Sequence, residues 1–411
     1  MKKFLIVFVG LLLIVAGCSN LSGGESGDNA SSGGSESVDE VVIGSLHPLS
    51  GGLAKEGQEM RDAVRLAVEE VNENGGIESL GGAKVVLEEA DHEGVAEKGV
   101  SEVQRLDREG VVGIIGTYTS GVALSATQEA ERAQIPFMID IATADEVTER
   151  NFQYTFRTQP MASTMAENFL IYLQELNRKY DADLKTAVLV HEDSVFGSGI
   201  ASFIEENAEE YGLEILANLP HSASTADLSS TVNKINSLKP DLVIPTTYLR
   251  DGTLLIEGLH QSNYKPKAII GVANGAFSND QFIQEKTDIN QHIMDVNYAI
   301  NPTSEKAKEV QASYQEKFGK SMSPNAAYSY TVTKILIDAI ERAGSTDRTT
   351  IMEALRETNY TDHILALGPI VFDETGQNEN ARAVVTQIFD GESKVVLPDE
   401  FKNEDAVYPM N

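Results

Sequence analysis

Short β-rich runs alternate with longer helical runs along the chain from about residue 39. Residues 41–46 predict a strand, and residues 58–72 then carry apolar side chains at helical spacing. Gly75 and Gly76 supply the left-handed conformations that often end a helix, and residues 84–89 predict the next strand. This repeated order of strand and helix favours a parallel, doubly wound sheet.

The same alternation continues to the end of the chain and restarts after Arg157. In the first block it predicts strands at 111–115 and 135–139 and a helix at 121–133. In the second block it predicts helices at 162–177, 196–211, 228–238 and 252–261, and strands at 186–191, 213–218, 242–247 and 268–270. Helices at 305–318, 326–343 and 349–358 and strands at 369–372 and 383–389 follow. Two similar α/β lobes are the simplest interpretation.

The first 38 residues have a different composition. Lys2 and Lys3 precede an apolar stretch at 4–16, and small residues lead up to Cys18, a pattern typical of a signal peptide at 1–17. The LIVAGC ending resembles a bacterial lipobox, which implies cleavage before Cys18 and acylation of its thiol; the alternative is a buried cysteine after an uncleaved anchor. Residues 18–38 are rich in Ser and Gly and predict a flexible tether.

Composition and charge exclude several classes of protein. In 411 residues, 41% hydrophobic and 23% charged side chains are ordinary for a soluble globular body. The 63 acidic and 32 basic residues give a net charge of −31, which opposes binding to nucleic acid. This acidity fits a solvated extracytoplasmic surface, and it leaves open adaptation to high salt or attraction of cationic ligands. A single cysteine allows no internal disulfide.

The loops after the predicted strands are the candidate site. In open parallel sheets, ligands bind beyond the carboxyl ends of the strands. The loops at 47–58, 116–121 and 140–143 are rich in hydroxyl groups and small residues that leave backbone amides accessible. Such loops suit an anion held at the N-terminus of a helix.

Several motifs in a fixed order resemble one known family. They read IGSLHPLSGGLAKEGQEMRDAVRLAVEEVNENGGI, IIGTYTSG, IPFMID, VHEDSVFGSG and LGPIVFDETGQN. Over residues 41–411 the chain resembles the leucine/isoleucine/valine-binding family of periplasmic binding proteins. The resemblance implies two doubly wound α/β lobes joined by three crossovers, the type I periplasmic binding protein fold. It implies a first lobe at 39–157 plus 295–370 and a second at 158–294 plus 371–411.

The resemblance also implies a function and a site. The expected protein is a lipid-anchored lipoprotein on the outer face of the cell membrane, which delivers a small-molecule ligand to an ABC transporter permease. The expected ligand is a hydrophobic or branched-chain amino acid, or a related small carboxylate or amide. The positions that match the family's carboxylate grip are Ser120, Ile141, Ala142 and Thr143, and the aromatic walls are Phe196, Tyr248 and Tyr118. From the residues alone, Ser120 could simply cap a helix and Phe196 could belong to the core.

Two positions depart from the family pattern. Glu56 stands where many members carry Tyr, and Asn274 lies where amino-acid-binding members place a carboxylate for the ligand ammonium. A buried ammonium without a counter-charge is costly, so either Glu56 supplies the charge or the ligand lacks an ammonium. The alternative for Glu56 is a solvated acid at the start of a helix.

Two other functions are alternatives to transport. An enzyme is disfavoured because no GxSxG, HExxH, complete GxGxxG or P-loop is present, and His92 and His191 lack a second histidine at helical spacing. We therefore expect no catalysis, no cofactor and no metal. A lipoprotein that reports a ligand to a membrane receptor or kinase would have the same fold and stays open. We expect a monomer with no nucleic-acid partner.

Overall fold

A computed structural model describes residues 38–410 of the protein. The signal peptide predicted at 1–17, Cys18 and nearly all of the tether predicted at 18–38 lie outside the described residues, so their interpretation stays a prediction. Of the described helices, none combines the length and the apolar character needed to cross a bilayer.

The first sheet has five strands, all parallel, in the order β2-β1-β3-β4-β5. Its strands are β1 (Glu40–His47), β2 (Lys84–Asp91), β3 (Ile114–Gly116), β4 (Phe137–Ile139) and β5 (Thr155–Arg157). The chain moves from β1 to β2 on one side and then to β3 on the other. This reversal of direction opens a crevice beyond the carboxyl ends of β1 and β3.

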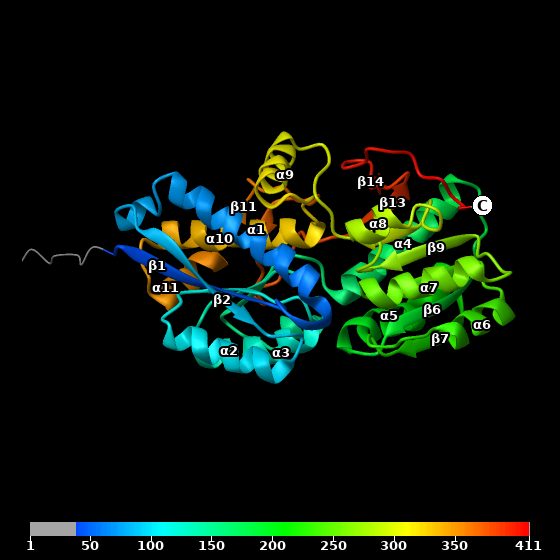
Figure 1. Ribbon diagram of the computed structural model, residues 1–411, viewed down its shortest axis with the longest axis horizontal. Coiled ribbons are helices and arrows are strands. Elements are labelled where there is room, and N and C mark those ends of the chain that lie inside the picture. The colour runs from blue at the N-terminus through cyan, green and yellow to red at the C-terminus, as the bar shows by residue number, and fades with distance from the viewer. Residues whose placement is uncertain (1–37, 411) are drawn as a thin grey trace, which may run out of the picture. The chain divides into compact units, whose positions relative to one another are not determined.

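Helices cover both faces of the first sheet (Figure 1). The helices α1 (Ala54–Glu73) and α10 (Pro324–Ala343) pack together on one face, and α2 (Ala96–Arg108) and α3 (Ser120–Arg132) pack together on the other. Successive strand residues alternate between the two cores: Ile115 belongs to the core with α1 and α10, whereas Ile114 belongs to the core with α2 and α3. Burial on both faces explains why the short strands β3 and β4 carry no polar side chain.

The second sheet has seven strands in the order β14-β13-β10-β9-β8-β6-β7. The strands β6 (Thr186–Glu192), β7 (Glu214–His221), β8 (Leu242–Thr246), β9 (Ala268–Val272) and β10 (Met294–Asn297) are parallel. The strands β13 (Val384–Phe389) and β14 (Glu392–Leu397) add an antiparallel edge. The sheet is therefore mixed rather than purely parallel, because the late chain returns as a hairpin.

Helices also cover both faces of the second sheet. The helices α4 (Ala162–Lys179) and α5 (Val195–Asn207) share a core with Leu189, and α6 (Ser229–Leu238), α7 (Leu249–Gln261) and α8 (Asp280–Glu285) share another with Val188. The remaining elements are α9 (Glu305–Phe318), α11 (Arg348–Arg356), β11 (Asn359–Tyr360), β12 (Ile370–Val371) and four short 3-10 helices at Gly51–Leu53, Glu78–Leu80, Asp145–Val147 and Ala208–Tyr211. The strand predicted at 369–372 is β12, which pairs only with β11 in a separate two-stranded sheet.

The described chain passes three times between the two sheets. It leaves the first sheet after β5, leaves the second after β10 to form α9 and α10, and returns after β12 to form β13. These passages match the predicted three crossovers, and the predicted α/β class is confirmed. The residue bounds of the two lobes stay a prediction, with one difference: residues 295–297, assigned to the first lobe, form part of β10 in the second sheet.

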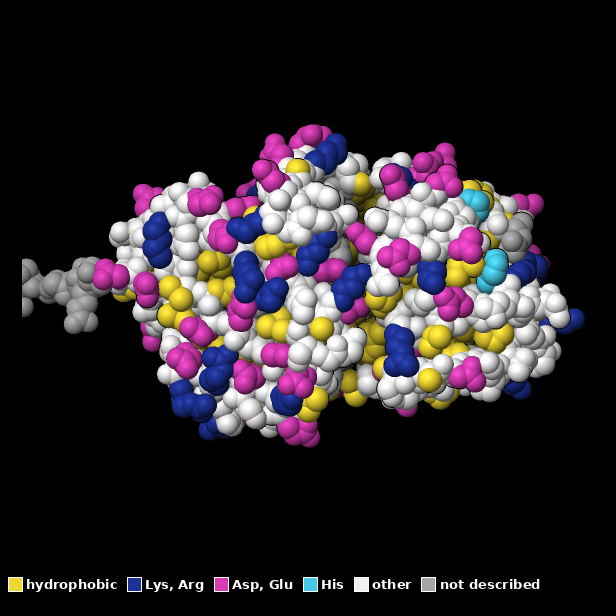
Figure 2. Space-filling view, viewed as in Figure 1, with side chains coloured by type: hydrophobic (Ala, Val, Ile, Leu, Met, Phe, Trp, Pro, Cys, Tyr) yellow, Lys and Arg dark blue, Asp and Glu magenta, His cyan; other side chains and the backbone are white. Residues whose placement is uncertain are grey.

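Acidic side chains do not gather in one patch on the face of the protein seen in Figure 2. Asp and Glu side chains are scattered over the visible surface, with Lys and Arg among them. Many are paired, as in the bidentate contact of Arg65 with Glu89. This distribution fits the solvated surface expected from the composition.

Candidate functional site

A cavity lies between the two sheets, beyond the carboxyl ends of their strands. About 380 Å³ of space lies between its side chains, a volume that includes solvent at its opening. The first sheet contributes Tyr118, Ser120, Ile141 and Thr143, and the second contributes Phe196, Thr247, Tyr248, Ala273, Gly275 and Ser278. Six of the nine predicted site residues thus meet at one place, although they come from four separate loops.

Ser120 joins the two loops of the first sheet. It is 2% exposed and its Oγ accepts a hydrogen bond of 3.2 Å from the backbone N–H of Ala144. Ser120 is the first residue of α3, and the N-cap position belongs to Thr119, whose side chain makes no capping bond. The capping alternative for Ser120 is therefore wrong. Its hydroxyl ties the loop after β3 to the loop after β4 and still has its own proton to donate.

A buried arginine shapes the loop after β4. Arg157, at the end of β5, donates to the carbonyl oxygen of Ala144 at 2.6 Å and to that of Ala142 at 3.4 Å, and Gln159 also donates to the Ala142 carbonyl. Because C=O and N–H point in opposite directions across a planar trans peptide, the N–H of Thr143 is directed away from Arg157. This leaves the Thr143 amide for a ligand in the cavity.

Aromatic rings form the opposite wall. Phe196, in the first turn of α5, lies 5.3 Å from Tyr248 between ring centroids, and Tyr118 from the first sheet lies 5.7 Å from Tyr248. Burial raises the pKa of the Tyr118 and Tyr248 phenols well above the usual value, so both are neutral. Gly275 permits this approach, since a Cβ there would lie 3.3 Å from the Tyr118 hydroxyl oxygen. The three rings offer an apolar surface for a ligand side chain.

Three predicted site residues are not among the described residues that line the cavity: Ala142, Glu56 and Asn274. Ala142 is 1% exposed, donates its N–H to Thr117 and turns its carbonyl to Arg157. Its role is to hold the loop, while the neighbouring Ile141 and Thr143 reach the cavity.

Asn274 is a structural residue of the turn after β9. It is fully buried, and its Oδ1 accepts from the backbone N–H groups of Ala276 and Phe277. Its Nδ2 donates to the Pro245 carbonyl and to Thr247 Oγ1 at 2.9 Å. With its amide fully used, Asn274 acts on the cavity only by orienting the Thr247 hydroxyl.

Glu56 is buried in α1 rather than solvated, being 4% exposed, so that alternative is wrong. Burial raises the pKa of its carboxyl group, with Lys55 acting in the opposite direction. Its neighbour Glu59 is also buried, and its pKa is raised to about 7. A carboxyl group that is costly to ionise is a weak partner for an ammonium.

Sequence reasoning missed the residues at the passage after β10. Asn297, Tyr298 and Asn325 line the cavity, and the Tyr298 hydroxyl donates to Asn325 Oδ1 at 2.7 Å. Asn297 Nδ2 donates to Asp295 at 2.8 Å, and burial raises the pKa of Asp295 to about 7. The Asn-Tyr pair at the end of a short buried run was the available signal.

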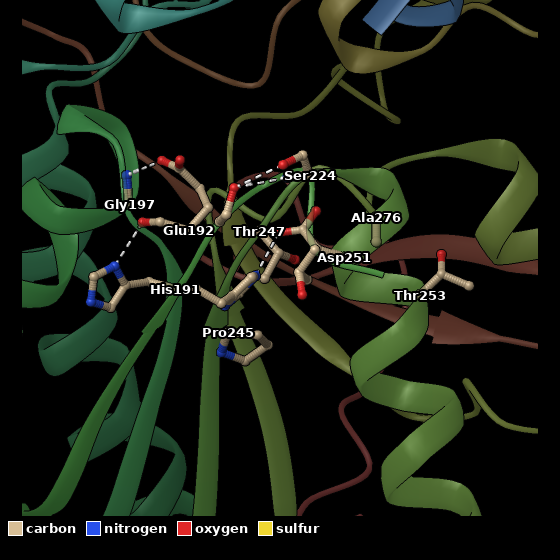
Figure 3. A network of polar contacts seen from close by, with 12 residues as sticks. His191, Glu192, Gly197, Ser224, Pro245, Thr247, Asp251, Thr253 and Ala276 are labelled. Atoms are coloured by element: carbon tan, nitrogen blue, oxygen red, sulfur yellow. Dashed lines mark hydrogen bonds and ion pairs between the residues drawn. The ribbon is translucent and has the colours of Figure 1, made fainter. Parts of the chain in front are cut away.

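Further carboxylates lie behind the wall of the second sheet (Figure 3). Glu192, at the end of β6, is turned to the N-terminus of α5, where it accepts from the Gly197 N–H at 2.7 Å and from Ser194. Asp251, in the first turn of α7, is fully buried and accepts from His221 Nε2 at 2.8 Å. Both carboxylates accept hydrogen bonds from residues on or beside the second sheet.

Two α/β parts with a polar and aromatic cavity between the carboxyl ends of their strands define a solute-binding protein. A family model described as "Periplasmic binding protein" matches residues 40–392, and the chain belongs to that family. Its members bind solutes and are not enzymes, so the expectation of a non-enzyme is confirmed. The family also implies a location outside the cytoplasm.

Relatives and solved structures agree with this assignment. "Leu/Ile/Val-binding protein homolog 7" of Brucella suis is 32% identical over 375 residues, which is 88% of this chain and 92% of the relative. "Leu/Ile/Val-binding protein homolog 8" of Brucella abortus is 32% identical over 371 residues, 88% and 91% of the two chains. The resemblance to the Leu/Ile/Val-binding family is thereby confirmed.

Solved structures share the fold of this chain. The branched-chain amino acid transporter substrate-binding protein LivJ from Streptococcus pneumoniae, in complex with isoleucine, gives a TM-score of 0.75 at 23% identity over 87% of this chain and 100% of that one. A solute-binding protein from Rhodopseudomonas palustris, in complex with benzoate, gives 0.75 at 18% identity over 88% and 99%. The type I periplasmic binding protein fold is confirmed.

Proposed function

We propose that this protein is the solute-binding component of an ABC importer, which captures a small solute between its two sheets and delivers it to a membrane permease. The observation that carries the proposal is the cavity itself, where hydroxyl and amide groups from the first sheet face aromatic rings from the second. Such a cavity buries a ligand only when both parts close on it, as in hinged binding proteins.

The names of the relatives support a branched-chain amino acid as the solute, and the proposal includes other hydrophobic amino acids and related small carboxylates or amides. Ser120 and Thr143 would bind its polar end, with Ile141 beside them. Phe196, Tyr248 and Tyr118 would enclose its apolar end, where each buried methylene contributes about 0.8 kcal/mol.

The proposal extends to how the protein is held at the membrane. Acyl chains on Cys18 would anchor it to the outer face, since two or more chains give stable attachment. The acidic, monomeric body would then capture solute near the permease.

A panel of solutes tests the proposal. The purified protein should gain thermal stability with at least one small solute, and Ser120→Ala should weaken that binding by about fivefold or more, since losing a hydrogen bond costs about 1 kcal/mol. Ser125→Ala is the matched control, because Ser125 lies on the same helix and bonds only to the Gly121 carbonyl.

Uptake of the same solute separates transport from sensing. Cells that lack the protein should lose high-affinity uptake of the solute. Normal uptake in those cells, together with tight binding by the purified protein, would contradict the importer role and favour the report of a ligand to a membrane receptor.

A further inference from the structure

Resting on the proposed function, we propose that the cavity selects small carboxylates that lack an ammonium group, with a branched aliphatic or aromatic remainder. The residues that line the cavity in the described part of the chain include no Asp, Glu, Lys, Arg or His. An amino acid bound there would bury its ammonium without a counter-charge, which is unfavourable.

Three polar groups of the cavity wall keep a free donor, whereas the lining hydroxyls of Ser278 and Tyr298 already donate to Asn274 and Asn325. Ser120 Oγ accepts from Ala144, and Thr247 Oγ1 accepts from Asn274, so each hydroxyl keeps its proton for a ligand. Asn325 Oδ1 accepts from Tyr298, which leaves the Asn325 amide N–H groups as the free ones. A ligand with several acceptor oxygens satisfies these donors, whereas an ammonium adds donors that need acceptors.

Thr143 provides a further donor. Its Oγ1 is buried and has no hydrogen-bond partner among the described residues, and its side chain is 3% exposed. A buried hydroxyl without a partner is costly unless a ligand supplies one. Together with the Thr143 N–H turned from Arg157 and the N-terminus of α3, it forms a site for a carboxylate.

A positive charge lies directly behind this carboxylate site. Arg157 is fully buried, and its described hydrogen bonds go to neutral acceptors on Gln377, Ala142, Ala144 and Thr148. Burial lowers the pKa of its guanidinium to about 10, which leaves it charged at neutral pH. Asp145 and other nearby acidic side chains already stabilise this charge, and an anion on the other face of the loop at 141–143 would stabilise it further, because Coulomb interactions are strong where water is excluded.

Three carboxylates near the cavity already accept hydrogen bonds from other partners. Asp140 accepts from His47 Nε2 and from Ser329, both at 2.7 Å. Glu192 accepts from the start of α5, and Asp295 from Asn297 and the Asn274 N–H. An ammonium would compete with these buried bonds, and among the described residues only Asp140 Oδ1 and Asp251 Oδ1 are buried carboxylate oxygens without a partner.

Asp251 is the strongest competitor to this inference. Its Oδ2 pairs with His221, but its Oδ1 is buried without a partner among the described residues. If the cavity took an amino acid, Asp251 would be the nearest unsatisfied acceptor on α7. Its substitution therefore belongs in the test.

Calorimetry with matched ligands tests the inference on the purified protein. Leucine is compared with 4-methylpentanoate, its analogue without the amine, and phenylalanine with 3-phenylpropanoate. We expect the amine-free member of at least one pair to bind at least tenfold more tightly than its amino acid. Equal or tighter binding of the amino acid in both pairs would overturn the inference.

A neutral analogue separates the anion from the rest of the ligand. 4-Methylpentanamide has the same size as 4-methylpentanoate without its charge, and we expect it to bind at least fivefold more weakly. Equal binding of amide and acid would overturn the role of the carboxylate. If none of these ligands binds, the inference is also overturned. The proposed function fails only if a broad panel of sugars, polyols, peptides and amides shows no binding either.

Two variants place the charge preference in the cavity. Ala273 lines it with a φ of 51°, a conformation that Asp and Asn tolerate better than most residues. Because Asp and Asn are nearly the same size but only Asp is negatively charged, the Asp variant should bind the carboxylate at least tenfold more weakly than the Asn variant. Equal binding by the two variants would contradict an anion at this site.

Asp251→Asn completes the test without altering the lining of the cavity. The preference for the amine-free ligand should persist in this variant. If wild-type protein binds leucine and Asp251→Asn loses that binding selectively, then Asp251 holds an ammonium and the inference is wrong. If Asp251→Asn does not fold, its unfolding transition will be absent. The comparison of ligand pairs on the wild-type protein then decides the inference.

Discussion

Lys55 forms hydrogen bonds between a helix beside the first sheet and a helix beside the second. Lys55, on α1 beside the first sheet, donates through Nζ to Asn279 Oδ1 at 3.0 Å and to Gln281 Oε1 at 3.3 Å. Both acceptors lie at the start of α8, which packs on the second sheet. Lys55→Met keeps the length of the side chain and removes both bonds, so it should favour the open form.

The magnitude follows from the exposure of these bonds. A hydrogen bond to a charged group is worth about 1.5–3 kcal/mol when shielded, but Lys55 is exposed and only the bond to Asn279 is partly buried. Screening by water reduces the sum to about 0.5–1.5 kcal/mol. Since about 1.4 kcal/mol is tenfold in affinity, Lys55→Met should weaken solute binding by roughly two- to tenfold.

Calorimetry and small-angle scattering measure this effect. The variant should bind solute more weakly, through faster dissociation, and its scattering without solute should indicate a more open form. Lys84→Met is the matched control, because Lys84 Nζ donates to the Asn72 carbonyl beside the same sheet. Unchanged affinity and scattering in Lys55→Met, or an equal effect in Lys84→Met, would refute the role of Lys55 in closure.

Three further predictions concern stability, anchoring and specificity. Burial raises the pKa of Asp295 from 3.8 to about 7, so the free energy of unfolding should fall by up to about 4 kcal/mol as pH rises from 4 to above 7. The thermal midpoint of Asp295→Asn should therefore rise relative to that of the wild type between pH 5 and 8. Midpoints that change with pH in parallel would contradict this. Cys18→Ala should release the protein from membranes or leave it unprocessed, as fractionation would reveal, and a processed, membrane-bound variant would count against acylation. Glu56→Gln should change solute affinity by less than about twofold in calorimetry, because Glu56 does not line the cavity. A loss of more than about 1 kcal/mol of binding free energy, typical of a charge-assisted hydrogen bond, would show that Glu56 contacts the ligand.

The pattern of the sequence predicted the long elements best. The strand predicted at 41–46 is β1, and the helix at 121–133 is α3, because each carries a clear apolar period. The helix α2 was missed because its apolar face rests on few residues in a highly charged segment. The strand β10 was missed because Asp295 and Asn297 interrupt its apolar pattern. Both side chains are buried and bond to each other, a pairing that the hydrophobicity of the sequence does not reveal.

The candidate site shows the same limit at the level of single residues. The loops were located correctly because the carboxyl ends of parallel strands fix where a ligand can bind. Within the turn after β9, however, Asn274 faces the protein and its neighbours Ala273 and Gly275 face the cavity. Which of three successive residues points outward depends on backbone turns and hydrogen bonds that form only in the folded chain.

A crystal structure with solute bound, at near-physiological concentration, tests the central claim most directly. We predict solute in the 380 Å³ cavity, with acceptor oxygens within hydrogen-bond distance of Ser120 Oγ and Thr143, and its apolar part against Tyr248. A second hollow of about 1330 Å³ lies nearby, lined by residues such as Gln311 and Lys394. Solute bound in that hollow, with Ser120 and Thr143 untouched, would contradict the site proposed for this protein.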